Sequence, residues 1–452
     1  MILTPAFRRA SLRLAFVVMV VSLPYSAVFA QAAPISDAPP FAQPLLGQVV
    51  ANSALSVVAA GNADRIAISP SFATVYDTNV LRRTQSDNTD AGNFRLTPGV
   101  SLVLRRSFGR LALNISGTAG YDFNNRYRFL NRSRIDFAGG IKAPVGAICN
   151  ANFSASYDQF QFDLGNVTQT LAAPTRNQNY DLSLGCQRTA GFSPVAGITY
   201  HSASSGGTIL YLDGETGEAG NIGSAPLKLY DYTQLSERGG LAYAQPSLGV
   251  VTLTAAASQL RRPNIVSSVG IDDSTNIKSL TLSLDRSVSP RVQLSLATGY
   301  TQANPNRGGV SSFAGVSFNG RINWRIVPRF VISASAIRQV TSENGINATY
   351  VIRDDLVAIA NWQVTHASQV SLSGSRSNRD FRGEGLALTV APLLTVAPLR
   401  ADRTTIVSAN YNYNTSRLLR LGFGISHQWR NADNPLYDYQ STIISGSVGT
   451  KF

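Results

Sequence analysis

Histidine is the first residue type to examine for catalysis, because general bases that work near neutral pH are most often histidines. The chain has three of them, at His201, His366 and His427. The strand pattern described below places His366 in a short turn and the other two on separate strands. The sequence shows no Ser-His-Asp or Cys-His set, no glycine-rich phosphate loop and no metal-ligand spacing. We therefore predict that the protein is not an enzyme and has no catalytic residue, no cofactor and no metal site.

The two cysteines, Cys149 and Cys186, are candidates for a covalent bond. Cys149 lies just after the short turn "APVG" and Cys186 just before the short turn at "RTAG", so both lie at the same end of two adjacent antiparallel strands. Alternation puts both side chains on one face, and opposed Cα atoms about 4.5–5.5 Å apart lie within reach of a disulfide. We predict this disulfide; the alternative is two unpaired small residues that are out of register by one or two positions.

The first thirty residues are typical of a secretory signal peptide. Arg8, Arg9 and Arg13 precede the apolar stretch "LAFVVMVVSL", and "VFA" offers a cleavage site after Ala30. No later stretch approaches the roughly 20 consecutive apolar residues that a membrane-spanning helix needs. The pattern excludes a helical membrane protein and predicts export from the cytoplasm, where a disulfide can form in the oxidising periplasm.

Composition also separates this chain from soluble enzymes. Hydrophobic residues make up 44% of the sequence and charged residues only 14%, compared with roughly 25% in soluble domains. A protein surface that contacts lipid does not need charged side chains, so a membrane location would explain the low charged fraction. The net charge of +13 becomes +10 when the three signal arginines are removed, and nearly all of the excess is arginine.

Arginine pairs with carboxylate and phosphate groups, so anionic glycans and lipopolysaccharide phosphates are reasonable partners. A genome that favours arginine codons explains the excess equally well. Nucleic acid is not expected as a partner, because the arginines are scattered and accompany no recognition motif.

The elements that position these residues are strands. Residues 31–64 are an Ala- and Pro-rich periplasmic lead-in, and from residue 65 to residue 452 segments of about ten residues alternate apolar and polar positions, as in "RLALNISGTAGYDF". Eight short connections alternate with longer polar ones, as in bacterial outer-membrane barrels. Eight short turns and two chain ends give 18 strands. The number could be 16, because residues 386–402 could be loop or strand. We predict an all-β transmembrane antiparallel up-and-down β-barrel in the bacterial outer membrane.

The chain ends on the aromatic residue Phe452, after an alternating run. Such an ending resembles the carboxy-terminal signal that the barrel-assembly machinery recognises, so Phe452 is the predicted assembly signal and this machinery a predicted partner. Aromatic residues near the outer strand ends are expected to form a girdle at the membrane surface. They are Tyr121, Tyr127, Tyr157, Tyr300 and Trp429.

A motif near the first strand carries a family resemblance. The stretch "YDTNVLRR", from Tyr76 to Arg83, is followed by "FRLTPGVSLVLRRSFGRLALNISGTAGYDF". This combination resembles the putative beta-barrel porin 2 family, whose members are often tied to exopolysaccharide production. The resemblance implies an outer-membrane barrel without catalytic residues and says little about the substrate.

Alternation also predicts which charged residues point into the lumen. They are Arg134, Asp136, Lys142, Asp158, Asp181, Asp285, Arg321 and Arg325. Eighteen strands enclose more space than side chains fill, so the predicted interior is a wet pore of mixed charge. The alternative is that these residues pair across the lumen and hold the barrel round, with the interior partly plugged by a loop or the lead-in.

Three functions remain open at this point. The first is a channel for exopolysaccharide export or for anionic glycans, which would have exopolysaccharide and periplasmic export proteins as partners. The second is a scaffold barrel that docks partners of a polysaccharide secretion system, and the third is a general solute porin. All three share outer-membrane lipid and lipopolysaccharide as surroundings.

Overall fold

Eighteen long strands follow one another from Arg65 to Thr450 and form one antiparallel sheet. They are β1 (Arg65–Asp77), β2 (Asn93–Phe108), β3 (Leu111–Asn124), β4 (Arg132–Val145), β5 (Cys149–Gln161), β7 (Pro174–Cys186), β8 (Gly191–Ser205), β11 (Tyr232–Gln245), β12 (Gly249–Arg261), β13 (Ser274–Ser289), β14 (Val292–Pro305), β15 (Phe313–Val327), β16 (Phe330–Thr341), β17 (Tyr350–Gln363), β18 (Ser368–Arg382), β19 (Ala401–Asn414), β20 (Leu419–Ala432) and β21 (Tyr439–Thr450). The minor elements are β6 (Leu171–Ala172), β9 (Ile209–Tyr211), β10 (Asn221–Ser224), and the 3-10 helices η1 (Arg128–Leu130), η3 (Leu227–Tyr230) and η4 (Pro435–Tyr437).

The computed structural model describes residues 65–84, 91–161, 164, 171–186, 188–206, 209–211, 221–224, 227–265, 270, 272–343, 348–383, 399–414 and 419–450. The predicted signal peptide (1–30), the lead-in (31–64) and the assembly signal Phe452 lie outside these residues, as does most of the ambiguous segment 386–402. Within the described residues, no helix is both long and apolar enough to cross a membrane.

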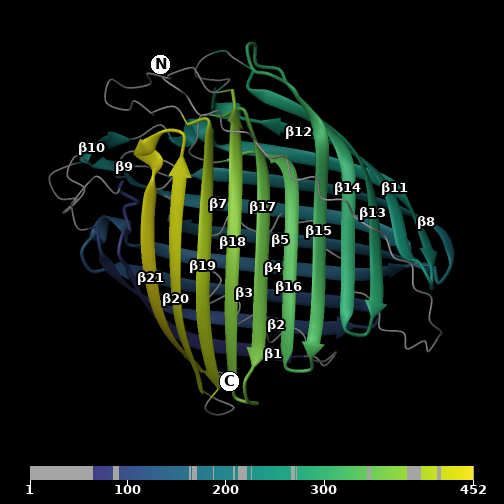
Figure 1. Cartoon of the computed structure of the whole chain (residues 1–452), viewed down its shortest axis with the longest axis horizontal. Coiled ribbons are helices and arrows are strands. Elements are labelled where there is room, and N and C mark those ends of the chain that lie inside the picture. The colour runs from purple at the N-terminus through teal and green to yellow at the C-terminus, as the bar shows by residue number, and fades with distance from the viewer. Residues whose placement is uncertain are drawn as a thin grey trace, which may run out of the picture. The chain divides into compact units, whose positions relative to one another are not determined.

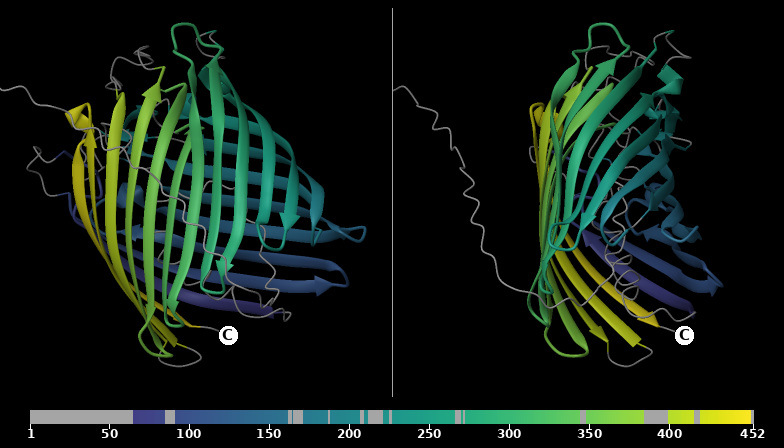
Figure 2. Two further views of the ribbon diagram at one scale, coloured as in Figure 1. Left: turned by 45° about the vertical axis from the view of Figure 1, so that its right-hand side comes forward. Right: turned by 90° about the vertical axis from the view of Figure 1, so that its right-hand side faces the viewer.

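The sheet closes on itself. Each long strand pairs with its neighbours in sequence, and β1 pairs with both β2 and β21, so the first strand joins the last. Figure 1 shows the strands of one wall, β15–β21, crossing those of the opposite wall at a steep angle, and Figure 2 shows the wall from two further directions. Tilted strands produce this crossing in a barrel. The predicted 18-stranded antiparallel barrel is confirmed.

Short turns at one end of the barrel set the strand count. Each connection predicted to be short joins two consecutive long strands, beginning with residues 109–110 between β2 and β3 and ending with residues 415–418 between β19 and β20. In the first of these turns, Gly109 has a φ of +59°, a left-handed conformation that glycine adopts without strain. Because the longer connections all lie at the other end, the short turns mark the periplasmic side.

The outer loops of β1 to β13 form a small hydrophobic core of their own. Its buried members come from five successive outer connections and are Leu81, Ala91, Tyr127, Leu130, Leu164, Ala173, Leu229 and Ile265. Loops from different positions around the wall can share one cluster only if they lean together, so they narrow the outer mouth on this side. The expectation that Tyr127 belongs to the aromatic girdle is wrong, because this side chain is fully buried among the loops, whereas Tyr121 and Tyr300 are exposed on the wall.

The two cysteines form a disulfide between β5 and β7. Cys149 lies directly opposite Cys186 in the register, and the bond closes a segment with a sequence separation of 37. Cys149 shares its face of β5 with Phe153, and Cys186 shares its face of β7 with Leu184; both neighbours are exposed on the wall. In the chain-entropy model a bridge of this span stabilises the protein by about 3–4 kcal/mol.

We expect the disulfide to be present in protein isolated from the outer membrane. Thiol labelling of the denatured, unreduced chain should find no titratable thiol, because the two cysteines are in register in an oxidising compartment. The same chain labelled after reduction is the control and should give two thiols. Two thiols per chain without reductant would contradict the bridge.

Candidate pore lining

The lipid-facing side of the wall is identified by its large exposed apolar side chains. On β13, Leu280 and Leu282 are 54% and 51% exposed and alternate with Thr281 and Ser283. The same alternation holds on β20, where Phe423 is 60% exposed between glycines. Apolar residues that face lipid and polar residues that face the lumen are typical of outer-membrane barrels. The polar set on each strand therefore lines the interior.

The charged residues predicted to line the pore all have lumen-facing positions. Arg134, Asp136 and Lys142 alternate on β4 with the exposed Phe137 and Ile141. Asp158, Asp181 and Asp285 alternate in the same way with the exposed Phe153 on β5, Leu182 on β7 and Leu282 on β13, and Arg321 and Arg325 with Ile322 and Trp324 on β15. Their role in conduction stays a prediction.

Most acidic residues in the outer and middle parts of the described lumen have basic partners on the same wall. Asp122 lies 3.5 Å from Arg134 and 3.7 Å from Arg95, and it accepts a hydrogen bond of 2.6 Å from Thr97. Asp181 lies 2.9 Å from Arg238 and accepts a hydrogen bond from Thr199. Such contacts join neighbouring or next-but-one strands. In these pairs the carboxylates are neutralised laterally, along the wall, rather than across the lumen.

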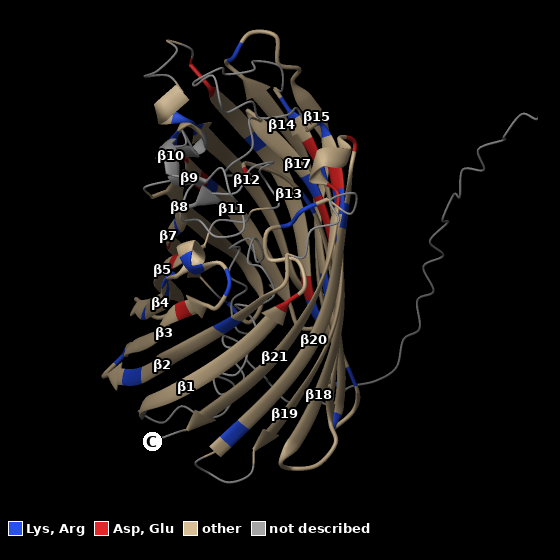
Figure 3. Cartoon of the chain, turned by 90° about the vertical axis from the view of Figure 1, so that its left-hand side faces the viewer, with Lys and Arg blue, Asp and Glu red and all other residues tan. Residues whose placement is uncertain are grey.

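A denser ion-pair group lies at the outer end of β18–β20. The carboxylate of Asp402 is fully buried and contacts Arg379 at 2.6 Å and also Arg430, while Arg379 contacts Glu343 at 3.1 Å. Figure 3 shows acidic and basic residues close together on the strands around β17. These residues were missed because only some of the lumen-facing charges were singled out, although Arg379, Asp402 and Arg430 follow the same alternation.

Asp136 and Asp158 lie directly opposite each other on β4 and β5, near the outer ends of these strands. Asp158 accepts a hydrogen bond of 2.8 Å from Asn177 on β7. Amide donors are a weaker compensation for a carboxylate than guanidinium groups.

The periplasmic half of the lumen has an excess of basic residues. Lumen-facing charged residues of the described strands at or below mid-strand include Arg105, Lys142, Arg321, Arg325, Arg420 and Asp285. The ion pair of Asp181 with Arg238 lies near the middle of its strands. Arg321 and Arg325 are exposed, and neither makes an ion pair with any described residue. Asp285 and Arg321 both lie opposite Ser295, on either side of β14, so two strand spacings of about 4.8 Å each separate them. The guanidinium groups of β15 are thus available to an anion in the lumen.

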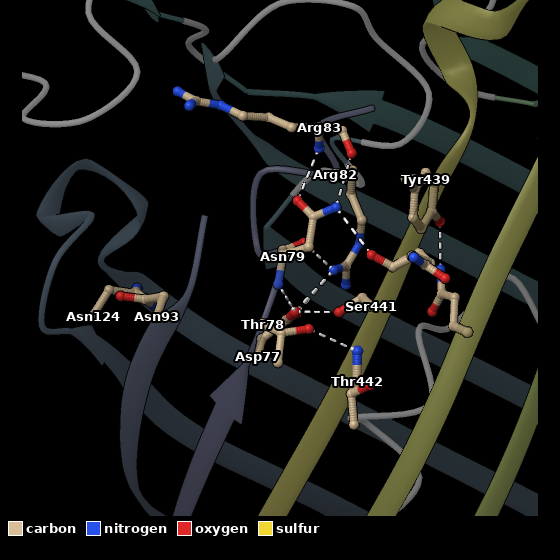
Figure 4. Close-up of polar contacts among 12 residues, drawn as sticks. Asp77, Thr78, Asn79, Arg82, Arg83, Asn93, Asn124, Tyr439, Ser441 and Thr442 are labelled. Atoms are coloured by element: carbon tan, nitrogen blue, oxygen red, sulfur yellow. Dashed lines mark hydrogen bonds and ion pairs between the residues drawn. The ribbon is translucent and has the colours of Figure 1, made fainter. Parts of the chain in front are cut away.

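The motif "YDTNVLRR" lies where the barrel closes. Asp77 at the outer end of β1 forms an ion pair of 2.9 Å with Arg82 and accepts hydrogen bonds from Ser441 on β21 and from the backbone N–H of Asn79. The Asn79 side chain donates to the carbonyl oxygens of Arg83 and Gln440. Figure 4 shows this group of contacts between the first and last strands. The motif therefore has a structural role, as a clasp at the seam between β1 and β21.

The histidines do not form a catalytic set. His201 on β8 contacts the hydroxyl of Tyr232 at 3.2 Å, His427 on β20 contacts the hydroxyl of Thr442 at 2.9 Å, and His366 lies in the turn between β17 and β18. In the part of the chain that the structure describes, no group of three or more His, Cys, Asp or Glu residues is placed to hold a metal ion.

A closed 18-stranded barrel with an apolar outer wall and a charged lumen defines an outer-membrane β-barrel of the porin and channel class. Residues 287–452 match the model of the family described as "Putative beta-barrel porin 2". This match, over the stretch that holds β14–β21, confirms the family resemblance and the outer-membrane location. It lies in a different part of the chain from the motif at Tyr76–Arg83. The barrel and the family match agree with the prediction that the protein is not an enzyme.

Solved structures with a similar barrel include the siderophore receptor PirA from Pseudomonas aeruginosa, with 11% identity, a TM-score of 0.40, and coverage of 87% of this chain and 81% of that one. OpdK from the same organism, solved with vanillate, has 9% identity, a TM-score of 0.41, and coverage of 86% and 99%. OccK5 (OpdH), also from Pseudomonas aeruginosa, has 11% identity, a TM-score of 0.40, and coverage of 87% and 100%. Similarities this low say nothing about what this chain binds. No curated protein sequence matches it.

Proposed function

We propose that this barrel is a channel for anionic glycans and serves the export of an acidic exopolysaccharide. The observation that supports this most strongly is the charge of the periplasmic half of the lumen, where Arg321 and Arg325 are exposed and have no acidic partner among the described residues. Guanidinium groups match carboxylate and phosphate groups in geometry and charge. A polymer that carries such groups would pass these arginines after it enters from the periplasm.

The distribution of charge along the lumen suits export more than import. Beyond the basic half, the acidic residues of the outer half are mostly neutralised by lateral ion pairs such as Asp122 with Arg134 and Arg95. A compensated outer half binds a polyanion less tightly than the basic inner half. Conduction requires binding that is strong enough for entry and weak enough for release. An outgoing anionic chain would enter at the basic periplasmic half, which favours binding, and leave through the compensated outer half, which favours release.

Current block by oligosaccharides tests this function. We expect an acidic oligosaccharide on the periplasmic side of a planar bilayer to interrupt the current at concentrations at least about tenfold lower than a neutral one of equal length, because one or two charge-assisted contacts contribute at least 1.4 kcal/mol. The neutral oligosaccharide is the matched control. Equal block by both compounds would favour a general solute porin, and a barrel that conducts no ions would favour a scaffold.

A further inference from the structure

Charged residues occupy lipid-facing positions on the outer wall of β16–β19. Arg338, Asp354, Asn378 and Arg403 are register neighbours on four successive strands. The register places them on the same face as Phe318, which is exposed on β15 next to Arg338, and Leu356, which is exposed two residues from Asp354. Their side chains therefore point away from the lumen. Charge on this face is unexpected in a barrel whose wall otherwise contacts lipid.

The same face is apolar on the periplasmic side of these positions. On this lipid-facing side, β17 continues towards the periplasm with Leu356, Ala358, Ala360 and Trp362. Strand β16 continues in the same direction with Ala336, Ala334, Ile332 and Phe330. The eight residue-to-residue steps from Trp362 to Asp354 span about 27 Å along the strand. At a strand tilt of about 40°, this is about 21 Å along the membrane normal. Because the apolar band of such barrels is about 25 Å tall, the charged positions lie near its upper edge, and long arginine side chains extend from there to the outer-leaflet headgroups.

Two arginines of this surface have no acidic partner. Arg376 on β18 and Arg403 on β19 are exposed, and each directs its Nε atom at Oδ1 of Asn378, at 3.5 Å and 2.9 Å. Neither makes an ion pair with a described residue. Two guanidinium groups that converge on one neutral amide repel each other unless an anion lies between or beside them.

The neighbouring charges are already compensated. Asp354 lies 3.5 Å from Arg338, and Asp380 lies 2.5 Å from Arg382. Asp433, at the rim, accepts hydrogen bonds from the backbone N–H groups of Arg400 and Ala401. Counting Arg338, Arg376, Arg382 and Arg403 against Asp354, Asp380 and Asp433, the surface keeps one net positive charge. The three carboxylates are held by donors other than Arg376 and Arg403. A phosphate monoester carries about 1.5 to 2 negative charges at pH 7.

We propose that Arg376 and Arg403, positioned by Asn378, bind a phosphate group of lipopolysaccharide in the outer leaflet. Arg338 and Arg382 flank the site and are held in place by Asp354 and Asp380. The face, the depth and the excess charge all match a phosphorylated headgroup lipid. This site lies on the outer wall and is independent of conduction through the lumen.

Lipopolysaccharide binding by the purified full-length barrel in detergent tests the proposal. The probe is a purified lipopolysaccharide that carries lipid A and inner-core phosphates, compared with the same material after dephosphorylation. We expect the double variant Arg376→Gln/Arg403→Gln to bind the phosphorylated form at least about tenfold more weakly than the wild type, because two charge-assisted contacts are lost. Dephosphorylation should weaken binding to the wild type by a similar factor.

Arg176→Gln is the matched control. Arg176 is an exposed arginine of β7 that donates to a side-chain amide oxygen, that of Gln159, at 3.2 Å, without a second arginine among the described residues that donate to that oxygen. Heat-modifiable migration shows whether each variant is folded. Equal affinity of the double variant and the wild type, or equal binding of the dephosphorylated lipid, would overturn the proposal. A double variant that binds lipopolysaccharide normally but loses an oligomeric state would instead identify the surface as a contact between copies of the chain.

Discussion

Replacing Asp77 with alanine is expected to destabilise the folded barrel by about 3–5 kcal/mol, the cost of leaving one member of a buried ion pair without its partner. The side chains of Asp77 and Arg82 are only 6% and 9% exposed. Removal of the carboxylate also leaves the Ser441 hydroxyl and the Asn79 N–H without the acceptor they share. Because Ser441 belongs to the last strand, the loss falls on the seam that closes the barrel.

The measurement is the free energy of unfolding in urea, with the folded barrel reconstituted in lipid and extrapolated linearly to water. Asp380→Ala is the matched control, since this aspartate pairs with Arg382 but its side chain is 46% exposed, and exposed pairs contribute about 0–1 kcal/mol. If both variants lose the same small amount of stability, the seam does not depend on Asp77.

The strand count could be predicted from the sequence because its determinants are local. Each short turn is marked by residues such as Gly109, which has a positive φ, and each strand by an alternation that two different surroundings impose. The disulfide follows from the same information, because turn positions fix which residues of β5 and β7 face each other. In an up-and-down barrel, neighbours in sequence are neighbours in space.

The arrangement of charges could be predicted only in part. Alternation gave the face of Asp181, but not that Arg238, more than fifty residues away, reaches over β8 to bind it. The burial of Tyr127 depends on five outer connections that share one cluster, and alternation contains no information about loops. The clasp at Asp77 was visible as a motif, but its role requires the pairing of β1 with β21.

The second large effect concerns the lumen. We expect Arg321→Ser/Arg325→Ser to lower the preference of the channel for anions at least about twofold at 0.1 M salt, where a charge acts over about 10 Å. The reason is that two exposed basic residues of the described lumen are removed from its periplasmic side. The fold should be retained, because both side chains are exposed and make no ion pair with a described residue.

Arg286→Ser is the matched control for this variant. Arg286 lies near the periplasmic end of β13, on the same face of the strand as the exposed Val288, so its charge does not line the lumen. We expect this substitution to leave ion selectivity unchanged. A control that shifts selectivity as much as the double variant would show that surface charge, and not the lumen, sets the preference.

The reversal potential of the wild-type barrel in a planar bilayer with a salt gradient tests the central claim most directly. A conducting lumen with a basic periplasmic half predicts a potential whose sign indicates anion preference and which moves towards zero in Arg321→Ser/Arg325→Ser. A barrel that does not conduct, or one whose reversal potential is the same in the wild type and the double variant, would contradict the account.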